Sequence, residues 1–203
     1  MKFVDLSVIL NENTPVYPGD PKTKIAPAGI LEKDGYEDHY ISVGTHVGTH
    51  IDAPRHMIAG GKSLDQIKVE QFTGRGVYIK IENKTFDLNK IKEVDIRVGD
   101  IVLFNTGMSE IYNTANYFEG YPAISEEVAH YLVDKKVKMV GVDTCSVDHE
   151  EFITHKILLG SEILIIENLT NLEELAGEEF KIYAFPLKLQ IDASPVRVVA
   201  EIL

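Results

Sequence analysis

The stretch SEEVAHYLVDKKVKMVGVD, residues 125–143, has the pattern of a helix that leads directly into a buried strand. Ser125 is a favoured N-cap residue, glutamates follow in the first turn and lysines close the last turn, the charge order that the helix dipole favours. The apolar run VKMVGVD (137–143) then predicts a strand. Because the strand-like segment DIVLFNTG (100–107) precedes it, this part of the chain predicts a β-α-β unit and an α/β fold.

Further elements are predicted on both sides of this unit. Ser63 and Gln66 have capping-box spacing, which indicates a short helix. Prolines and a glycine enforce an irregular loop over NENTPVYPGDPKTK (11–24). Other strands and a helix are predicted at GVYIKIE (76–82), HEEFITHKILLG (149–160, the helix), EILIIEN (162–168) and, as two strands joined by a turn, within 181–203. We therefore expect one mixed α/β domain over residues 1–203.

Composition limits the classes of partner. The 203 residues, 44% of them hydrophobic, can bury one sizeable core. A net charge of −12 opposes binding to nucleic acid or to an anionic membrane, so a small molecule is the expected partner. No segment has the roughly 20 apolar residues of a membrane span, and the N-terminus lacks a signal-peptide pattern. With a single cysteine, Cys145, and hence no internal disulfide, we expect a cytoplasmic protein.

The segment GTHVGTHIDAPRH (44–56) contains three of the seven histidines: His46, His50 and His56. A straight strand would place His46 and His50 on one face but about 13 Å apart, at about 3.3 Å per residue. Imidazoles that share a metal need bonds of about 2.0–2.1 Å. We therefore expect a tight bend or a single helical turn, which the glycines at 44 and 48 allow.

Asp52 adds a carboxylate to the two imidazoles, a ligand set that suits Zn²⁺, Mn²⁺ or Fe²⁺. His56 follows Pro54, which redirects the chain, so His56 is expected near the site as a proton donor and acceptor. The alternative is a set of surface histidines in a polar loop. Further ligands must come from elsewhere, and the candidates are His149, His155, Asp143, Asp148, Glu150, Glu151 and Glu167. Glu167 is favoured because a carboxylate at the end of an apolar strand needs a partner; the choice between His149 and His155 stays open.

These residues resemble the metal-dependent cyclase-like hydrolases, a family that includes bacterial kynurenine formamidase and isatin hydrolase. HVGTHIDAPRH is similar to the family signature His-X-Gly-Thr-His-X-Asp-X-Pro-X-His. The resemblance extends from about residue 3 to residue 200 through the segments TPVYPGDP, GDIVLFNTG, GVDTCSVD, HKILLGSEILIIENLTNL and SPVRVVA.

The resemblance implies a compact β/β/α domain with a mixed, barrel-like sheet flanked by helices, usually in a homodimer. It implies two divalent ions, Zn²⁺ in the first place and Mn²⁺ as the alternative. The implied ligands of the first ion are His46, His50 and Asp52, and Asp52 and Glu167 would bridge to a second ion that His155 completes. His56 would be the catalytic acid/base, and His39, His130 and His149 would have outer or surface roles. Tyr17 stands where the family commonly has a substrate-stacking tryptophan.

The expected function is amide hydrolysis by a metal-bound hydroxide, with an aryl formamide such as N-formylkynurenine as substrate, as in tryptophan catabolism. Alternatives are hydrolysis of a cyclic amide or a lactone, as in isatin hydrolase, and metal binding without catalysis. A nucleophilic Cys145 with His149 is a further alternative, although a lone cysteine usually packs as a small apolar residue. No Gly-X-Ser-X-Gly motif is present, so that type of serine hydrolase has no support.

Overall fold

The predicted β-α-β unit lies at the centre of the fold. In the computed structural model, which describes residues 2–203, it consists of β6 (Ile101–Asn105), α3 (Glu126–Asp134) and β7 (Met139–Val142). β6 and β7 are parallel neighbours in the sheet. The Ser125 hydroxyl accepts a hydrogen bond from the backbone N–H of Val128, so the predicted N-cap of α3 is present.

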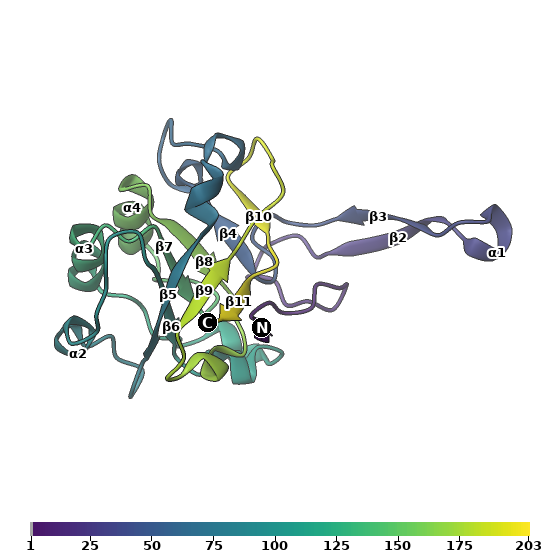
Figure 1. The fold of residues 1–203 in the computed structure, drawn as a ribbon. Coiled ribbons are helices and arrows are strands. Elements are labelled where there is room, and N and C mark those ends of the chain that lie inside the picture. Colours follow the sequence, from purple (N-terminus) through teal and green to yellow (C-terminus); the bar gives the residue numbers. More distant parts are fainter. Residues whose placement is uncertain (1) are drawn as a thin grey trace.

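The unit belongs to a nine-stranded mixed sheet with the order β1-β11-β9-β5-β6-β7-β8-β4-β10. The four central strands from β5 to β8 are parallel, and antiparallel strands flank them on both sides. The sheet curls strongly into a half barrel (Figure 1), which confirms the predicted fold class. The remaining strands are β1 (Lys2–Asp5), β4 (His50–Asp52), β5 (Thr73–Lys80), β8 (Leu164–Glu167), β9 (Phe180–Tyr183), β10 (Ala193–Pro195) and β11 (Val199–Ile202).

Both faces of β6, β7 and β8 are buried, as is usual for parallel strands. On β6, Ile101 and Leu103 belong to the core inside the curled sheet, whereas Val102 and Phe104 belong to a second core beneath the helices. The helices that cover this second face are α2 (Leu88–Lys92), α3 and α4 (Ile153–Gly160) (Figure 1). In the described part of the chain, no helix has the length and apolar character needed to cross a membrane.

The C-terminal third differs from the prediction of two strands joined by a turn. It forms three strands, β9, β10 and β11, and the chain between β9 and β10 lies along the segment that follows β4. The backbone N–H groups of Ala53, Leu64 and Asp65 donate to carbonyls of residues 189–192 at 2.8–3.1 Å. These long-range hydrogen bonds have no local sequence signal, which is why β10 was not predicted.

A hairpin arm projects from the body of the molecule (Figure 1). It contains β2 (Lys24–Gly29), α1 (Leu31–Asp34) and β3 (Asp38–Ser42). Within the described part of the chain, its two strands pair only with each other. Nearly all of its residues are exposed to solvent. The arm therefore packs against little else in its own chain.

Candidate metal centre

The histidine segment bends before it enters β4. Gly48 has a φ of +63°, a left-handed conformation that costs glycine little and other residues more. The bend brings the His46 and His50 rings to a centroid separation of 5.1 Å. After β4, Pro54 begins a 3₁₀ turn over Pro54–His56, and this turn returns His56 to within 4.1 Å of the His46 ring. The expected tight bend is thus what places these three imidazoles together.

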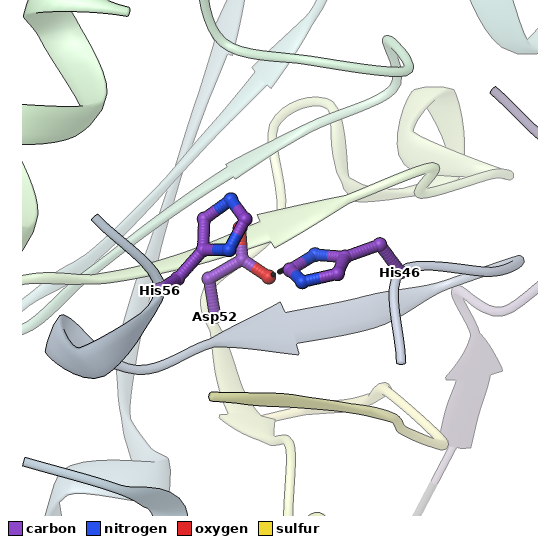
Figure 2. Close-up of side chains that lie close together, drawn as sticks. All are labelled: His46, Asp52 and His56. Carbon is purple, nitrogen blue, oxygen red and sulfur yellow. Dashed lines mark ion pairs between the residues drawn. The ribbon is translucent and has the colours of Figure 1, made fainter. Parts of the chain in front are cut away.

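Asp52 lies at the centre of the cluster and is fully buried. Its Oδ1 lies 3.0 Å from His46 Nδ1 and 3.6 Å from His50 Nε2, and its Oδ2 lies 4.0 Å from His155 Nε2. Figure 2 shows the ion pair between His46 and Asp52, with the His56 ring beside it. One carboxylate therefore faces three imidazoles, two from the histidine segment and one from α4.

Glu167 closes the cluster from the neighbouring strand. It is the last residue of β8 and pairs in register with His50 of β4. Its two carboxylate oxygens lie 3.3 Å from His50 Nε2 and 3.3 Å from His155 Nε2. The centre is thus at the carboxyl end of a parallel strand, the edge where open α/β sheets usually bind ligands.

The imidazoles of His46, His50 and His155, here called the inner imidazoles, each have a further partner at the ring nitrogen that does not face Asp52. His50 Nδ1 donates to the Gly48 carbonyl at 2.8 Å. His155 Nδ1 lies 2.6 Å from Asp148 Oδ1, and the other Asp148 oxygen accepts the His155 backbone N–H at 3.0 Å. His46 Nε2 lies 2.9 Å from Asp192 Oδ2. This is the usual outer environment of metal-binding histidines, in which one ring nitrogen is oriented by a carboxylate or carbonyl and the other is left for the ion.

The inner atoms fit a divalent cation. Within residues 2–203, His50 Nε2 and both Asp52 oxygens are buried without a hydrogen-bond partner, an arrangement that is costly unless something else satisfies them. The donor atoms of His50, Asp52 and Glu167 lie within 4.8 Å of one another, as do those of His46, Asp52 and His56. Imidazole nitrogens and carboxylate oxygens are ligands that Zn²⁺ and Mn²⁺ accept.

The protonation equilibria divide the four histidines into two kinds. Burial alone would lower the pKa of His46 and of His155, but the carboxylates beside them raise the pKa to about 9 and about 10 respectively. The pKa of His50 is also raised, because Asp52 and Glu167 outweigh its burial. In contrast, the pKa of His56 is lowered by burial and by the neighbouring imidazoles. These shifts favour the protonated form of the three inner histidines and the neutral form of His56.

The two central carboxylates remain ionised. Burial would raise their pKa values, but the histidines around Asp52 and Glu167 lower both. A cation that enters the centre would displace the protons on the imidazoles and take over their role as counter-charges.

The other candidate ligands lie away from this centre. His149 is exposed and stacks on Tyr121 at 4.5 Å, whereas His155 faces the carboxylates of the centre. Asp143 accepts hydrogen bonds from Thr106, and burial raises its pKa. Asp148 contacts Nδ1 of His155, whereas the Nε2 of the same ring faces the centre. Exposed positions are occupied by His39, His130, Glu150 and Glu151.

A cavity of about 220 Å³ opens onto the centre. The lining of this cavity contains the imidazoles of the four histidines and the carboxylates of Glu167 and Asp20. The other lining residues include Tyr17, Met57, Cys145 and Phe152. Tyr17 packs edge-on against Phe118 at a centroid distance of 6.1 Å. Burial, together with the charge of Glu167, raises the pKa of the Cys145 thiol to about 12, which opposes the thiolate that a cysteine nucleophile requires.

The family model described as a putative cyclase matches residues 4–149. The chain belongs to this cyclase family. The resemblance to cyclase-like hydrolases is therefore confirmed.

Relatives of this cyclase-family chain match it over nearly its full length. An uncharacterized protein of Methanocaldococcus jannaschii is 37% identical over 202 residues, which cover 98% of this chain and 99% of that protein. The kynurenine formamidase of Bacillus cereus is 28% identical over 204 residues, with 98% and 96% covered. A solved structure described as a potential metal-dependent hydrolase with cyclase activity superposes with a TM-score of 0.83 at 32% identity, covering 98% of this chain and 96% of that one.

Sequence reasoning missed Asp192 in this cyclase-family chain. It directly precedes β10 and reaches the centre only because β10 pairs with β4. A carboxylate before a three-residue strand carries no local signal of this kind. The pairing of β10 with β4 is what places Asp192 at the centre.

Proposed function

We propose that this protein is a metal-dependent hydrolase that cleaves a non-peptide C–N bond, with an aryl formamide such as N-formylkynurenine as its substrate. The observation that carries this proposal is the buried set of ligand atoms on His50 and Asp52 that have no hydrogen-bond partner within residues 2–203. They lie beside His56, whose pKa is lowered and which lines an open cavity. The similarity to kynurenine formamidase of B. cereus and to a potential metal-dependent hydrolase supports the reaction class.

The donor set divides between two divalent ions, for which Zn²⁺ is proposed and Mn²⁺ is the alternative. His46, His50 and Asp52 would hold the first ion. Asp52 would also contact the second, together with His155 and Glu167. When bound, such ions lower the pKa of a coordinated water and polarise the carbonyl of the scissile amide.

His56 supplies the proton transfers in this proposal. Its lowered pKa leaves the imidazole neutral near pH 7, so it can accept a proton from the attacking water. The resulting imidazolium can then donate that proton to the leaving amine. Asp192 Oδ2 lies 3.5 Å from His56 Nδ1 and stabilises the charged ring between these two proton transfers.

The cavity wall supports an aromatic substrate. Tyr17 and Phe152 present rings to the same cavity, and Met57 adds an apolar, adaptable surface. Offset or edge-on contacts between aromatic rings contribute about 0.5–1.5 kcal/mol beyond area burial. These side chains would therefore hold the ring of an aryl formamide, with the formyl carbonyl directed toward the imidazoles.

The activity is tested by removing metal from the full-length protein and restoring Zn²⁺ or Mn²⁺, with N-formylkynurenine, isatin and a lactone as substrates. We expect formamide cleavage to be lost on chelation and to return with metal. Activity that is unchanged by metal removal would contradict the mechanism. Preferred cleavage of isatin or the lactone would reassign the substrate, and tight zinc binding without any turnover would identify a non-catalytic metal protein.

His56 is tested separately from the metal. The His56→Ala variant should bind Zn²⁺ as the parent protein does but lose about 10²–10⁴-fold in kcat, the usual contribution of general acid–base catalysis. His130→Ala is the matched control, because His130 is exposed on α3. A His56→Ala variant with the activity of the control would remove the role assigned to His56.

We also propose a homodimer in which the hairpin arm contacts a second copy of the chain. An isolated two-stranded hairpin is marginally stable in water at best, and this one exposes Leu31, Tyr36, Tyr40 and Ile41 at 55–69% of their surface. Replacing residues 25–41 by a short glycine-serine linker should give a monomer in sedimentation equilibrium while zinc binding is retained. A variant that sediments like the parent protein would contradict the role of the arm.

A further inference from the structure

Asp192 is fixed in position by the strand pairing around the centre. Its carbonyl accepts the Ala53 backbone N–H at 2.8 Å, and the next residue, Ala193, pairs in register with Asp52. Ile191 on its other side accepts the backbone N–H of Leu64 at 3.1 Å. The main chain of Asp192 is thus attached to the same segment that carries Asp52 and His56.

One oxygen of the Asp192 side chain faces two imidazoles. Oδ2 lies 2.9 Å from His46 Nε2 and 3.5 Å from His56 Nδ1. The two rings are 4.1 Å apart between centroids and tilted by 41°, so a single acceptor can reach both. Across residues 2–203, Asp192 is the one carboxylate within 4.0 Å of a His56 nitrogen.

The other inner histidines have separate outer partners. His50 is oriented by the Gly48 carbonyl, and His155 is oriented by Asp148. Among residues 2–203, His56 shares its one such partner, Asp192, with His46. Its contact with Asp192 is longer than an ideal hydrogen bond, but catalytic hydrogen bonds are often long before substrate binds.

We propose that Asp192 is a positioning residue that orients His46 and His56 together through one carboxylate oxygen. The contact at Nδ1 favours the His56 tautomer with its proton on that nitrogen, which leaves Nε2 free to accept a proton in the cavity. This inference rests on the role of His56 in the proposed function. Asp192 thereby couples a metal-binding imidazole to the proton-transferring one.

The test uses Asp192→Asn and Asp192→Ala in the full-length protein. Zinc affinity, measured by competition with a chelator, should fall about 10–100-fold, the usual cost of losing an outer partner of a ligand. At saturating Zn²⁺, kcat should still fall by about 10–100-fold with little change in KM. In the His56→Ala background the same substitutions should change kcat by less than about twofold, because coupled residues are non-additive. Asp134→Asn, an exposed change of equal charge on α3, should alter none of these quantities.

A second readout does not depend on turnover. The ring ¹⁵N spectrum of the zinc-loaded protein should show the Nδ1–H tautomer for His56 and a loss of that preference in Asp192→Ala. If the proposed substrate is not cleaved at all, zinc affinity and the tautomer still test the inference.

Three results would overturn it. One is a kcat loss of equal size with and without His56, and another is a kcat that recovers fully at saturating Zn²⁺. The third is a His56 tautomer that is the same in the parent protein and in Asp192→Ala. Each would show that Asp192 does not position His56.

Discussion

At the scale of single residues, the charge balance of the centre depends on Asp52. It is buried, it remains ionised, and it faces three imidazoles whose protons provide the counter-charge in the metal-free protein. Among the described residues, neither of its oxygens accepts a hydrogen bond of normal geometry, so its charge is balanced through ion pairs. Removing its charge should therefore affect cation binding more than it affects folding.

We expect Asp52→Asn to lower zinc affinity at least roughly 100-fold, beyond the usual effect of an outer partner. An amide keeps the shape of the carboxylate but presents one weaker ligand oxygen and an NH₂ group. Zinc stoichiometry after dialysis and competition titration measure the effect, with Asp134→Asn as the control. A variant that retains two tightly bound ions would show that Asp52 is not a ligand.

The sequence predicted the residues of the centre to different degrees. His46, His50 and Asp52 are close in the chain, and Glu167 ends an apolar strand, so spacing and burial cost point to them. The choice of His155 over His149 depends on where α4 begins, after a left-handed Phe152. Asp192 depends on strand pairing between distant segments, which local patterns do not encode.

At the scale of elements, the bend at Gly48 links the hairpin arm to β4 and sets the distance between two imidazoles. The prediction of a bend followed from the metal geometry that a straight strand cannot satisfy. The β-α-β unit was predicted because its helix and strands have local periodicity and capping. The segment HYIS within β3 was predicted as a β-type run, but the hairpin that it forms with β2 was not, because the arm has no core-facing pattern. β10 was not predicted because it is only three residues long.

We expect Gly48→Ala to destabilise the protein by about 1–2 kcal/mol, the cost of a left-handed conformation for a residue with a Cβ. Because relief of this strain would move His46 away from His50, zinc affinity should fall as well. Gly177→Ala is the matched control, since Gly177 has a φ of +79° and open space around it. Thermal unfolding and zinc titration should show similar losses of stability but a loss of affinity only at Gly48. Unchanged zinc affinity in Gly48→Ala would contradict the role of the bend.

At the scale of the whole molecule, the metal-free centre makes stability depend on pH. The folded-state pKa values of His46 and His155, about 9 and about 10, lie above the value of 6.5 expected for an unfolded chain. Protonation of these groups therefore favours the folded state. Their contribution is fully present below pH 6.5 and is lost as the pH rises through 9 to 10.

We expect the free energy of unfolding of the metal-free protein to fall between pH 7 and pH 10. Each kcal/mol lost should lower Tm by about 2–4 °C. The zinc-loaded protein should show a weaker dependence, because cations replace the protons. Urea unfolding at several pH values measures the slope, and a His46→Gln/His155→Gln variant serves as the control. A flat profile for the metal-free parent protein would contradict these protonation states.

The pairing of β4 between β8 and β10 has a consequence for how the protein is made. Asp52 and its neighbours are synthesised early, but Glu167 and Asp192 follow more than 100 residues later. A chain still emerging from the ribosome thus carries the histidine segment without the strands that enclose it. Contacts of such long sequence separation form slowly. The complete centre therefore requires the C-terminal part of the chain, because Glu167 and Asp192 reach it only through the pairing of β8 and β10 with β4.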